Sequence, residues 1–98
     1  MRWTWAPAKN RKNIKQHGVS FEVAQLVFED PLAVTLPDPH EDEERWRTIG
    51  TPSAYSEVVL FVVHTWPDEA EDGEEVGRII SARKATNNER RAYEKGEF

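Results

Sequence analysis

The sequence predicts an α+β domain in which helices pack against a mostly antiparallel sheet. Two observations lead to this prediction. Apolar residues between positions 21 and 28 recur at helical spacing, whereas residues 58–63 form an unbroken apolar run, typical of a strand buried on both faces. Further β-prone segments are short and are separated by Pro, Gly and Asp, which favour turns. The expected order is β-α-α-β-β-β-β-α, within one domain that spans residues 1–98.

The first strand and helix are predicted from alternation and from the residues at the helix ends. Trp3-Thr4-Trp5 alternates aromatic and β-branched side chains, which predicts a short strand. Pro7 suits the first position of a helix and Gly18 suits its end, so we expect a helix over residues 8–16. Ala6 would be the N-cap, and its side chain cannot accept a hydrogen bond from the free amides, at a cost of about 1 kcal/mol.

A second helix is expected to begin at Ser20 and to end at Asp30-Pro31. Serine is a favoured N-cap, Glu22 in the first turn complements the helix dipole, and a proline disfavours helical geometry in the residue before it. The apolar face of this helix should lie in the core, and it consists of Phe21, Ala24, Val27 and Phe28.

The rest of the chain predicts four strands and a last helix. The strands are expected at residues 32–36, 45–50, 55–65 and 76–85, with residues 58–63 buried at the centre of the sheet. A polar loop at 37–44 and an acidic turn at 68–75 lie between them. Thr86 and Glu89 have the spacing of a capping box, so the last helix should run from there to about Lys95.

The charge distribution limits the classes of function. The net charge of −5 argues against a protein that coats nucleic acid non-specifically. Residues 1–28 hold five basic side chains and one acidic side chain. Residues 29–76 hold two basic and fourteen acidic side chains, and residues 77–98 hold six basic and three acidic ones. The basic ends would form a positive patch if the fold brings them together. The alternative is that they pair with the acidic middle segment.

Other classes are excluded by what the sequence lacks. Without cysteine there are no disulfides and no cysteine zinc sites, and no His-x3-His spacing points to a metal. No apolar run reaches the roughly 18–20 residues of a membrane span, and the first ten residues have no apolar signal core. We therefore expect a cytoplasmic protein with no membrane contact.

Several motifs follow one another along nearly the whole chain, from about Trp3 to Gly96. They are Trp5-x-Pro-x-Lys9-x3-Asn13-x2-Gln16-His17-Gly18-Val19-Ser20-Phe21, Val27-Phe28-x-Asp30-Pro31, Glu44-Arg45-Trp46-x2-Ile49-Gly50, Arg78-Ile79-Ile80-Ser81-Ala82-Arg83-x-Ala85 and Glu89-Arg90-x2-Tyr93. This series resembles the BrnT family, the toxins of BrnT/BrnA type II toxin–antitoxin modules. Two positions depart from the family pattern: Ala6 stands where Asp is usual, and Gln16 where Lys is frequent.

The resemblance implies a RelE-like fold and a ribonuclease that cleaves RNA and blocks translation without a metal ion or another cofactor. It also implies a basic ribbon-helix-helix antitoxin of the BrnA type as partner. That antitoxin would mask the toxin and bind operator DNA, so the toxin would reach DNA only through its partner.

Metal-independent RNA cleavage requires cations that stabilise the phosphorane, and arginine is suited to this because it binds phosphate through a planar fork. We expect Arg83 and Arg45 in the catalytic role, and the substrate-binding candidates are Arg47, Arg78 and Lys84. Strand alternation places Arg45 and Arg47 on one face with Trp46 on the other. It places Arg78 and Lys84 opposite Arg83, unless a bulge intervenes. The alternative for each arginine is a salt bridge with the acidic middle segment.

The reaction also requires a base and an acid. His17, at a helix C-terminus, is one candidate, and its alternative role is to cap the last carbonyls. Glu89 is either a capping-box residue or the base, and Tyr93 on the same helical face would contact RNA according to the resemblance. We expect His64 to be structural and His40 to be solvated.

A second function class fits the charges directly. The chain could be a non-catalytic binding module, or an inactive toxin homologue, that pairs with a basic DNA-binding partner through the acidic loops at 38–44 and 68–75. Trp46 would then lie in the core or in the partner interface, whereas in a ribonuclease it could stack on a base. Convergence of Arg45, Arg83 and His17 in one concave patch would favour the enzyme.

Overall fold

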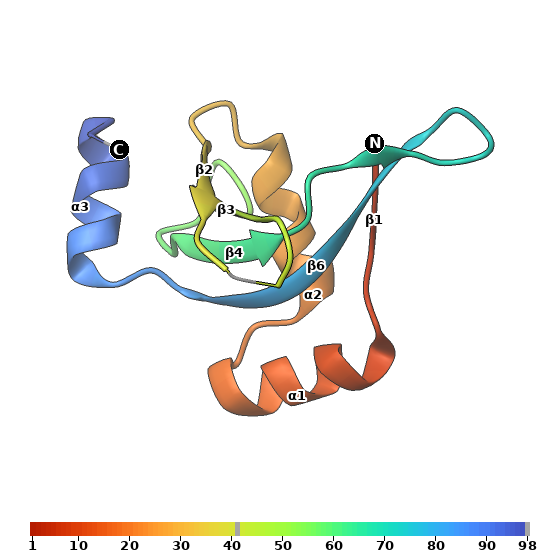
Figure 1. Ribbon diagram of the computed structural model, residues 1–98. Coiled ribbons are helices and arrows are strands. Elements are labelled where there is room, and N and C mark those ends of the chain that lie inside the picture. The colour runs from red at the N-terminus through yellow and green to blue at the C-terminus, as the bar shows by residue number, and fades with distance from the viewer. Residues whose placement is uncertain (41, 98) are drawn as a thin grey trace.

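A computed structural model describes residues 1–40 and 42–97 of the chain, and the statements below concern these residues (Figure 1). They form a six-stranded sheet, three α-helices and one 3-10 helix, in the order β1 (Arg2–Thr4), α1 (Pro7–His17), α2 (Phe21–Ala24), η1 (Gln25–Glu29), β2 (Val34–Asp38), β3 (Arg45–Gly50), β4 (Leu60–His64), β5 (Asp68–Glu69), β6 (Glu75–Lys84) and α3 (Asn87–Lys95). The predicted α+β class is therefore confirmed, with β5 as an added strand. None of these helices is long and apolar enough to span a membrane.

The sheet has the strand order β1-β6-β4-β3-β2, and β5 pairs with β6. The chain forms an antiparallel meander from β2 through β3 and β4 to β6, as predicted, and β1 lies parallel to β6 at the edge. The pairing of β1 places Trp3 opposite Gly77, where a β-carbon would collide with the indole ring. Glycine is therefore required there by the close approach of Trp3.

The α2 helix and the 3-10 helix η1 cover one face of the sheet. Phe21, Ala24 and Val27 are fully buried, as predicted. They pack in one cluster with sheet residues Leu60, Val62, Ile79 and Ala82. We call this side the helix-covered face. Phe28 is only partly buried, and its ring stacks on that of Trp3 with 3.8 Å between centroids.

The helix ends follow the sequence signals. Ala6 provides no side-chain cap to α1, and Gly18 ends it with a φ of 69°. The Ser20 hydroxyl accepts a hydrogen bond from the Val23 amide at 3.1 Å. The second helix begins as predicted but tightens after Ala24 into the 3-10 helix η1.

Two buried asparagines that sequence reasoning did not single out fix α1 in place. The Asn13 amide donates to the carbonyls of Val19 and Ala82 and accepts from the Ala82 amide, so it pairs with β6 as a neighbouring strand would. Asn10 accepts from the Phe21 amide and donates to Glu22. These bonds satisfy buried polar groups and hold α1 along the edge of β6.

The central strand is shorter than predicted. It begins at Leu60, not at residue 55, and Val58 is 39% exposed in the preceding loop. The expectation that the whole run 58–63 is buried is wrong for Val58, and Val63 is only half-buried. It holds for the four residues between them. The Ser56 hydroxyl accepts a hydrogen bond from the Val58 amide, which stabilises the loop conformation in place of strand pairing.

The connections at both ends of the acidic segment also differ from prediction. The strand expected at 32–36 lies at Val34–Asp38, because Asp30 binds the Leu32 amide and extends the turn. Pro37 is tolerated there since β2 is an edge strand. The acidic turn expected at 68–75 is a hairpin in which β5 pairs with β6. Glu41, in the polar loop expected at 37–44, lies outside the described residues.

A bulge in β6 changes which side chains share a face. Val63 pairs with Ser81 and His64 pairs with Ile79, so Ile80 is an extra residue without a partner on β4. Ile79 lies in the helix-covered core, which places Arg78 on the other face. The expectation that Arg78 lies opposite Arg83 is therefore wrong, and the bulge is the reason.

Candidate functional site

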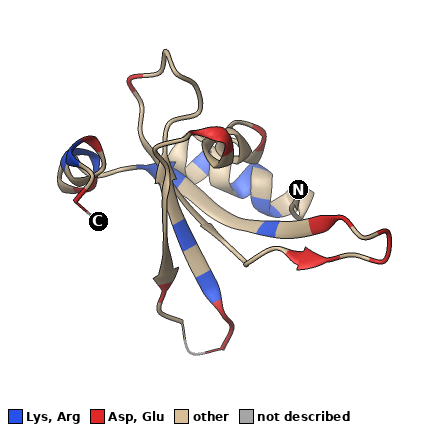
Figure 2. Cartoon of the chain, turned by 90° about the horizontal axis from the view of Figure 1, so that it is seen from above, with Lys and Arg blue, Asp and Glu red and all other residues tan. Residues whose placement is uncertain are grey.

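The second face of the sheet carries four arginines. We call it the open face, and by strand register it presents Arg45, Arg47, Ile49, Phe61, Val63, Arg78, Ser81 and Arg83. Arg47, Val63 and Ser81 lie in one row across three strands, and Ile49, Phe61 and Arg83 lie in the next. Since neighbouring strands are about 4.8 Å apart, the arginines surround the half-buried side chains of Val63 and Ser81. In Figure 2, blue segments lie along the strands and α1, and red segments gather in the hairpins.

Arg83 is the most firmly held of these arginines. Its Nη1 and Nη2 donate to the two Glu89 carboxylate oxygens at 2.8 and 3.1 Å. The guanidinium carbon lies 4.1 Å from the centroid of the Phe61 ring. The hydrogen bond to Glu89 raises the pKa of Arg83. The side chain is 36% exposed, so a fixed cation is presented to solvent at the edge of the open face.

The other three arginines pair with the acidic middle segment, so the salt-bridge alternative is confirmed for them. Glu43 bridges Arg45 at 2.9 Å and Arg78 at 3.0 Å, and Arg47 lies 3.7 Å from Asp38. The hydrogen bond from Arg45 and the charge of Arg78 lower the pKa of Glu43. Solvent screens such pairs at the protein surface, so they contribute little to the stability of the fold.

Glu89 is a capping-box residue. Its carboxylate accepts from the Thr86 amide at 2.8 Å, and its own amide donates to the Thr86 hydroxyl. The hydrogen bond from Arg83, together with that of the Thr86 amide, lowers the pKa of Glu89 to about 2. A general base is most effective with a pKa near the working pH, so Glu89 is poorly suited to that role. The geometry makes it a positioning residue for Arg83.

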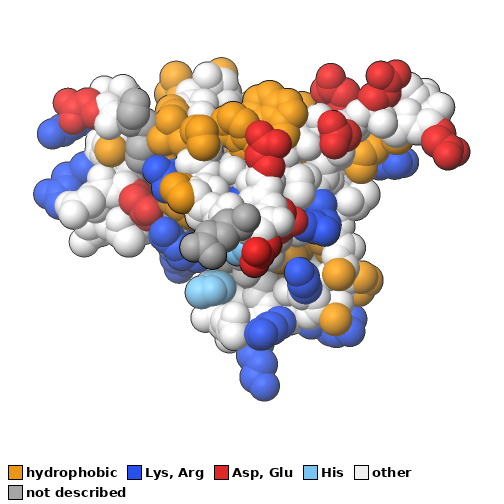
Figure 3. Space-filling view, viewed as in Figure 1, with side chains coloured by type: hydrophobic (Ala, Val, Ile, Leu, Met, Phe, Trp, Pro, Cys, Tyr) orange, Lys and Arg blue, Asp and Glu red, His pale blue; other side chains and the backbone are white. Residues whose placement is uncertain are grey.

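His17 lies beside the open face, not on it. It lines a hollow of about 210 Å³ between α1 and the edge of β6, together with Lys9, Lys12, Asn13, Gln16, Ile80 and Ser81. Ser81 belongs both to this hollow and to the open face. Arg45 and Arg83 thus share a face, but neither lines the hollow that His17 lines at its outer edge. The three side chains therefore do not meet in that hollow, whereas the enzyme hypothesis expected them to converge. Figure 3 shows blue side chains mainly in the lower part of the molecule and red ones at its upper right.

Lys84 is separated from the four arginines. It pairs with Leu60 of the helix-covered face and lines a hollow with Ile14, Val19 and Val23. It therefore does not join the arginines in one substrate-binding surface, which confirms that it lies opposite Arg83.

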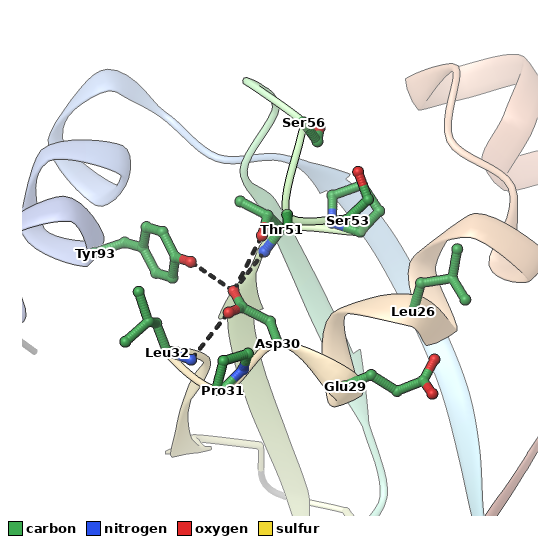
Figure 4. A pocket seen from close by; sticks show the side chains of 11 residues that line it. Leu26, Glu29, Asp30, Pro31, Leu32, Thr51, Ser53, Ser56 and Tyr93 are labelled. Carbon is green, nitrogen blue, oxygen red and sulfur yellow. Dashed lines mark hydrogen bonds between the residues drawn. The ribbon is translucent and has the colours of Figure 1, made fainter.

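Tyr93 binds a carboxylate that sequence reasoning treated only as a helix terminator. Its hydroxyl donates to Asp30 at 2.5 Å, and Asp30 also accepts from Thr51 and from the Leu32 amide (Figure 4). Burial raises the pKa of Asp30, but these hydrogen bonds outweigh burial and lower it. Burial and Asp30 raise the pKa of Tyr93. Tyr93 thus anchors α3 beside a hollow of about 600 Å³, and its hydroxyl is bound to Asp30. The side chain also packs against the buried cluster that contains Phe61, the ring beneath Arg83.

His64 is buried and neutral, in agreement with its predicted structural role. It is 2% exposed, and its Nδ1 lies 2.7 Å from the Thr65 carbonyl, which can only accept. Nδ1 therefore carries the proton, and Nε2 accepts from the Thr48 hydroxyl at 2.7 Å. Thr48 in turn pairs with Thr35 at 2.7 Å. His40 is exposed in the β2–β3 loop, as expected.

The burial of His64 gives the fold a pH dependence. Burial lowers the pKa of His64 from its usual 6.5, so below that pH the unfolded chain binds the proton more readily. We expect the free energy of unfolding to be highest above pH 6.5 and to fall as the pH drops below it. Urea unfolding at several pH values measures this slope. His64→Gln should flatten it and His40→Gln should not, and equal slopes in all three proteins would contradict the assignment.

Within residues 1–40 and 42–97, no three His, Asp or Glu side chains gather as a metal ligand set. The sequence of the chain matches the family model described as "Ribonuclease toxin, BrnT, of type II toxin-antitoxin system" over residues 5–89. The matched range includes all four arginines of the open face, His17 and Glu89, and it ends before Tyr93. No curated protein matches the chain.

Proposed function

Because the chain belongs to the BrnT family of ribonuclease toxins from type II toxin–antitoxin systems, we propose that its open face binds RNA and cleaves it without a metal ion, which blocks translation. The observation that supports this proposal is the set of four arginines on one sheet face. The β6 bulge is essential to the set, since it turns Arg78 to the side of Arg83.

In the proposed reaction the ribose 2′-oxygen attacks the adjacent phosphorus and the bond to the 5′-oxygen breaks. The products are a 2′,3′-cyclic phosphate and a 5′-hydroxyl. Arg83 stabilises the negative charge that develops on the non-bridging oxygens, and Arg45 assists it. Arg47 and Arg78 hold the neighbouring phosphates after these displace Asp38 and Glu43.

His17 is the proposed proton-transfer group: it takes the proton of the 2′-hydroxyl and passes it to the departing 5′-oxygen. Imidazole can both accept and donate a proton, and His17 lines one hollow with Ser81 at the border of the open face. Glu89 is already ionised and bound to Arg83, so we assign it to positioning. Tyr93 contributes to the site indirectly, by anchoring α3, the helix that carries Glu89.

The partner proposed for this toxin is a basic antitoxin of the BrnA type with a ribbon-helix-helix fold. A net charge of −5 suits a basic protein partner and disfavours direct DNA binding, so operator DNA would be bound by the antitoxin. The alternative function is that of a non-catalytic binding module, and the three arginines already paired with carboxylates favour it.

The products of RNA cleavage test the proposed function. We expect the purified protein to leave 2′,3′-cyclic phosphate or 3′-phosphate ends, and to cleave at the same rate with and without EDTA. Mass spectrometry of the fragments identifies these ends. A 3′-hydroxyl end, or activity lost in EDTA, would overturn the mechanism. Absence of cleavage with retained antitoxin binding would establish the binding module instead.

A further inference from the structure

Two tryptophans form a second feature, distinct from the four arginines of the open face. Trp46 and Trp66 lie with 4.7 Å between ring centroids and planes tilted by 53°. Trp66 is 55% exposed, which is unusual for so large an apolar side chain. The two rings line a hollow of about 350 Å³ with Glu44, Thr65 and Asp68. We call it the tryptophan hollow.

The carboxylates of this hollow are not neutralised. Glu44 and Asp68 are exposed, and neither lies in an ion pair with a cation of the described residues. Glu43, next to Glu44 in the chain, is by contrast shared by two arginines. No Lys or Arg lines the hollow. It therefore presents two aromatic rings and two uncompensated negative charges to solvent.

This combination selects for a cation. Indole rings attract guanidinium and ammonium groups through their faces, and carboxylates add charge and hydrogen-bond acceptors. RNA is disfavoured, because its phosphates would approach Glu44 and Asp68 while its bases stack on the rings. Tryptophan is also among the residues that contribute most to protein interfaces, particularly when it meets an arginine of the partner.

We propose that the tryptophan hollow receives a Lys or Arg side chain from a basic segment of the protein partner. This inference rests on the antitoxin half of the proposed function and names the chemistry by which the partner is recognised. The hollow lies between the β2–β3 loop, which supplies Glu44, and the β5–β6 hairpin, which begins at Asp68, so a partner segment there also meets the acidic side chains of both connections.

A peptide titration followed by NMR tests the proposal on the toxin alone. The probe is an amidated peptide in which arginines alternate with Gly-Ser pairs, and the control peptide carries citrulline, which has the shape of arginine without its charge. Each of the four tryptophans carries one indole N–H group, and its signal is assigned by substituting that tryptophan. We expect the arginine peptide to shift the signals of Trp46 and Trp66 and to leave those of Trp3 and Trp5 unchanged. The citrulline peptide should shift none of them.

Two pairs of variants separate the hollow from the general negative field. Glu44→Gln with Asp68→Asn removes its two charges, whereas Glu71→Gln with Asp72→Asn removes two charges of the β5–β6 hairpin that do not line it. The first pair of substitutions should weaken binding of the arginine peptide about threefold more than the second pair does. Trp66→Ala should weaken binding of the arginine peptide by a similar factor. Trp66→Phe, which retains an aromatic ring, should weaken the binding less.

Three results would overturn the proposal: equal weakening by both pairs, equal binding of the citrulline peptide, or tighter binding of an oligouridylate at Trp46 and Trp66. No RNA is present in the peptide titration, so its failure leaves the cleavage mechanism untouched. Absence of ribonuclease activity would likewise leave the peptide result valid.

Discussion

RNA that carries a hydrogen or a methoxy group in place of the 2′-hydroxyl at the scissile nucleotide is expected to remain intact. In the proposed reaction this oxygen is the nucleophile, so its removal leaves no group to attack the phosphorus. The four arginines would still bind the strand, because their proposed partners are phosphates. Cleavage is measured by gel electrophoresis of end-labelled oligonucleotides, with binding followed separately by fluorescence anisotropy.

The matched control carries the same substitution at a neighbouring nucleotide, where cleavage at the scissile bond should proceed at the normal rate. Cleavage of the modified bond itself would exclude the 2′-oxygen as nucleophile. It would then point to a water molecule as the attacking group.

Arg83→Ala is expected to reduce the cleavage rate by roughly 10²–10³-fold, the scale of losing one preorganised charge-stabilising group. The guanidinium is held by Glu89 and by the Phe61 ring, so it is a cation fixed in place before the substrate binds. Arg83→Lys keeps the charge but loses the planar fork, and it should recover only part of the rate. Single-turnover cleavage gives the rate directly.

Arg90→Ala is the control for charge and position, because Arg90 is a comparably exposed arginine of α3 that pairs only with Glu94. It should cleave at the normal rate. Thermal unfolding of both variants should show that Arg83→Ala costs no more than about 1–2 kcal/mol. A folded Arg83→Ala protein with full activity would remove Arg83 from the mechanism.

The elements with local signals were predictable from sequence. Ser20, Gly18 and the Thr86–Glu89 pair act within a few residues, so both the start of the second helix and the capping of α3 follow from their neighbours. The start of β4, by contrast, could not be predicted from neighbouring residues. The apolar run extends back to Val58, but Asp30 binds Thr51 across 21 residues and the 51–58 loop turns away from the sheet.

The candidate site was predictable in its residue types and less so in their grouping. Alternation placed Arg45 and Arg47 together, because β3 is regular. The same alternation rule placed Arg78 on the wrong face, because no sequence pattern near Ile80 predicts the bulge. The resemblance alone suggested that Tyr93 contacts RNA, and its hydrogen bond to Asp30, 63 residues away, was not foreseen. Nor was the bond between Asn13 and Ala82, which lie 69 residues apart. Long-range side-chain bonds have no signature in a single sequence.

The bond between Asn13 and Ala82, with the parallel pairing of β1 and β6, has a consequence for how the toxin is made. Both contacts join the start of the chain to its last quarter, and they are separated by about 69 residues. At synthesis rates of about 5–20 residues per second, α1 is synthesised about 3–14 s before its partner residues in β6. Because β6 carries Arg78 and Arg83, the nascent chain cannot complete the open face before β6 has been synthesised.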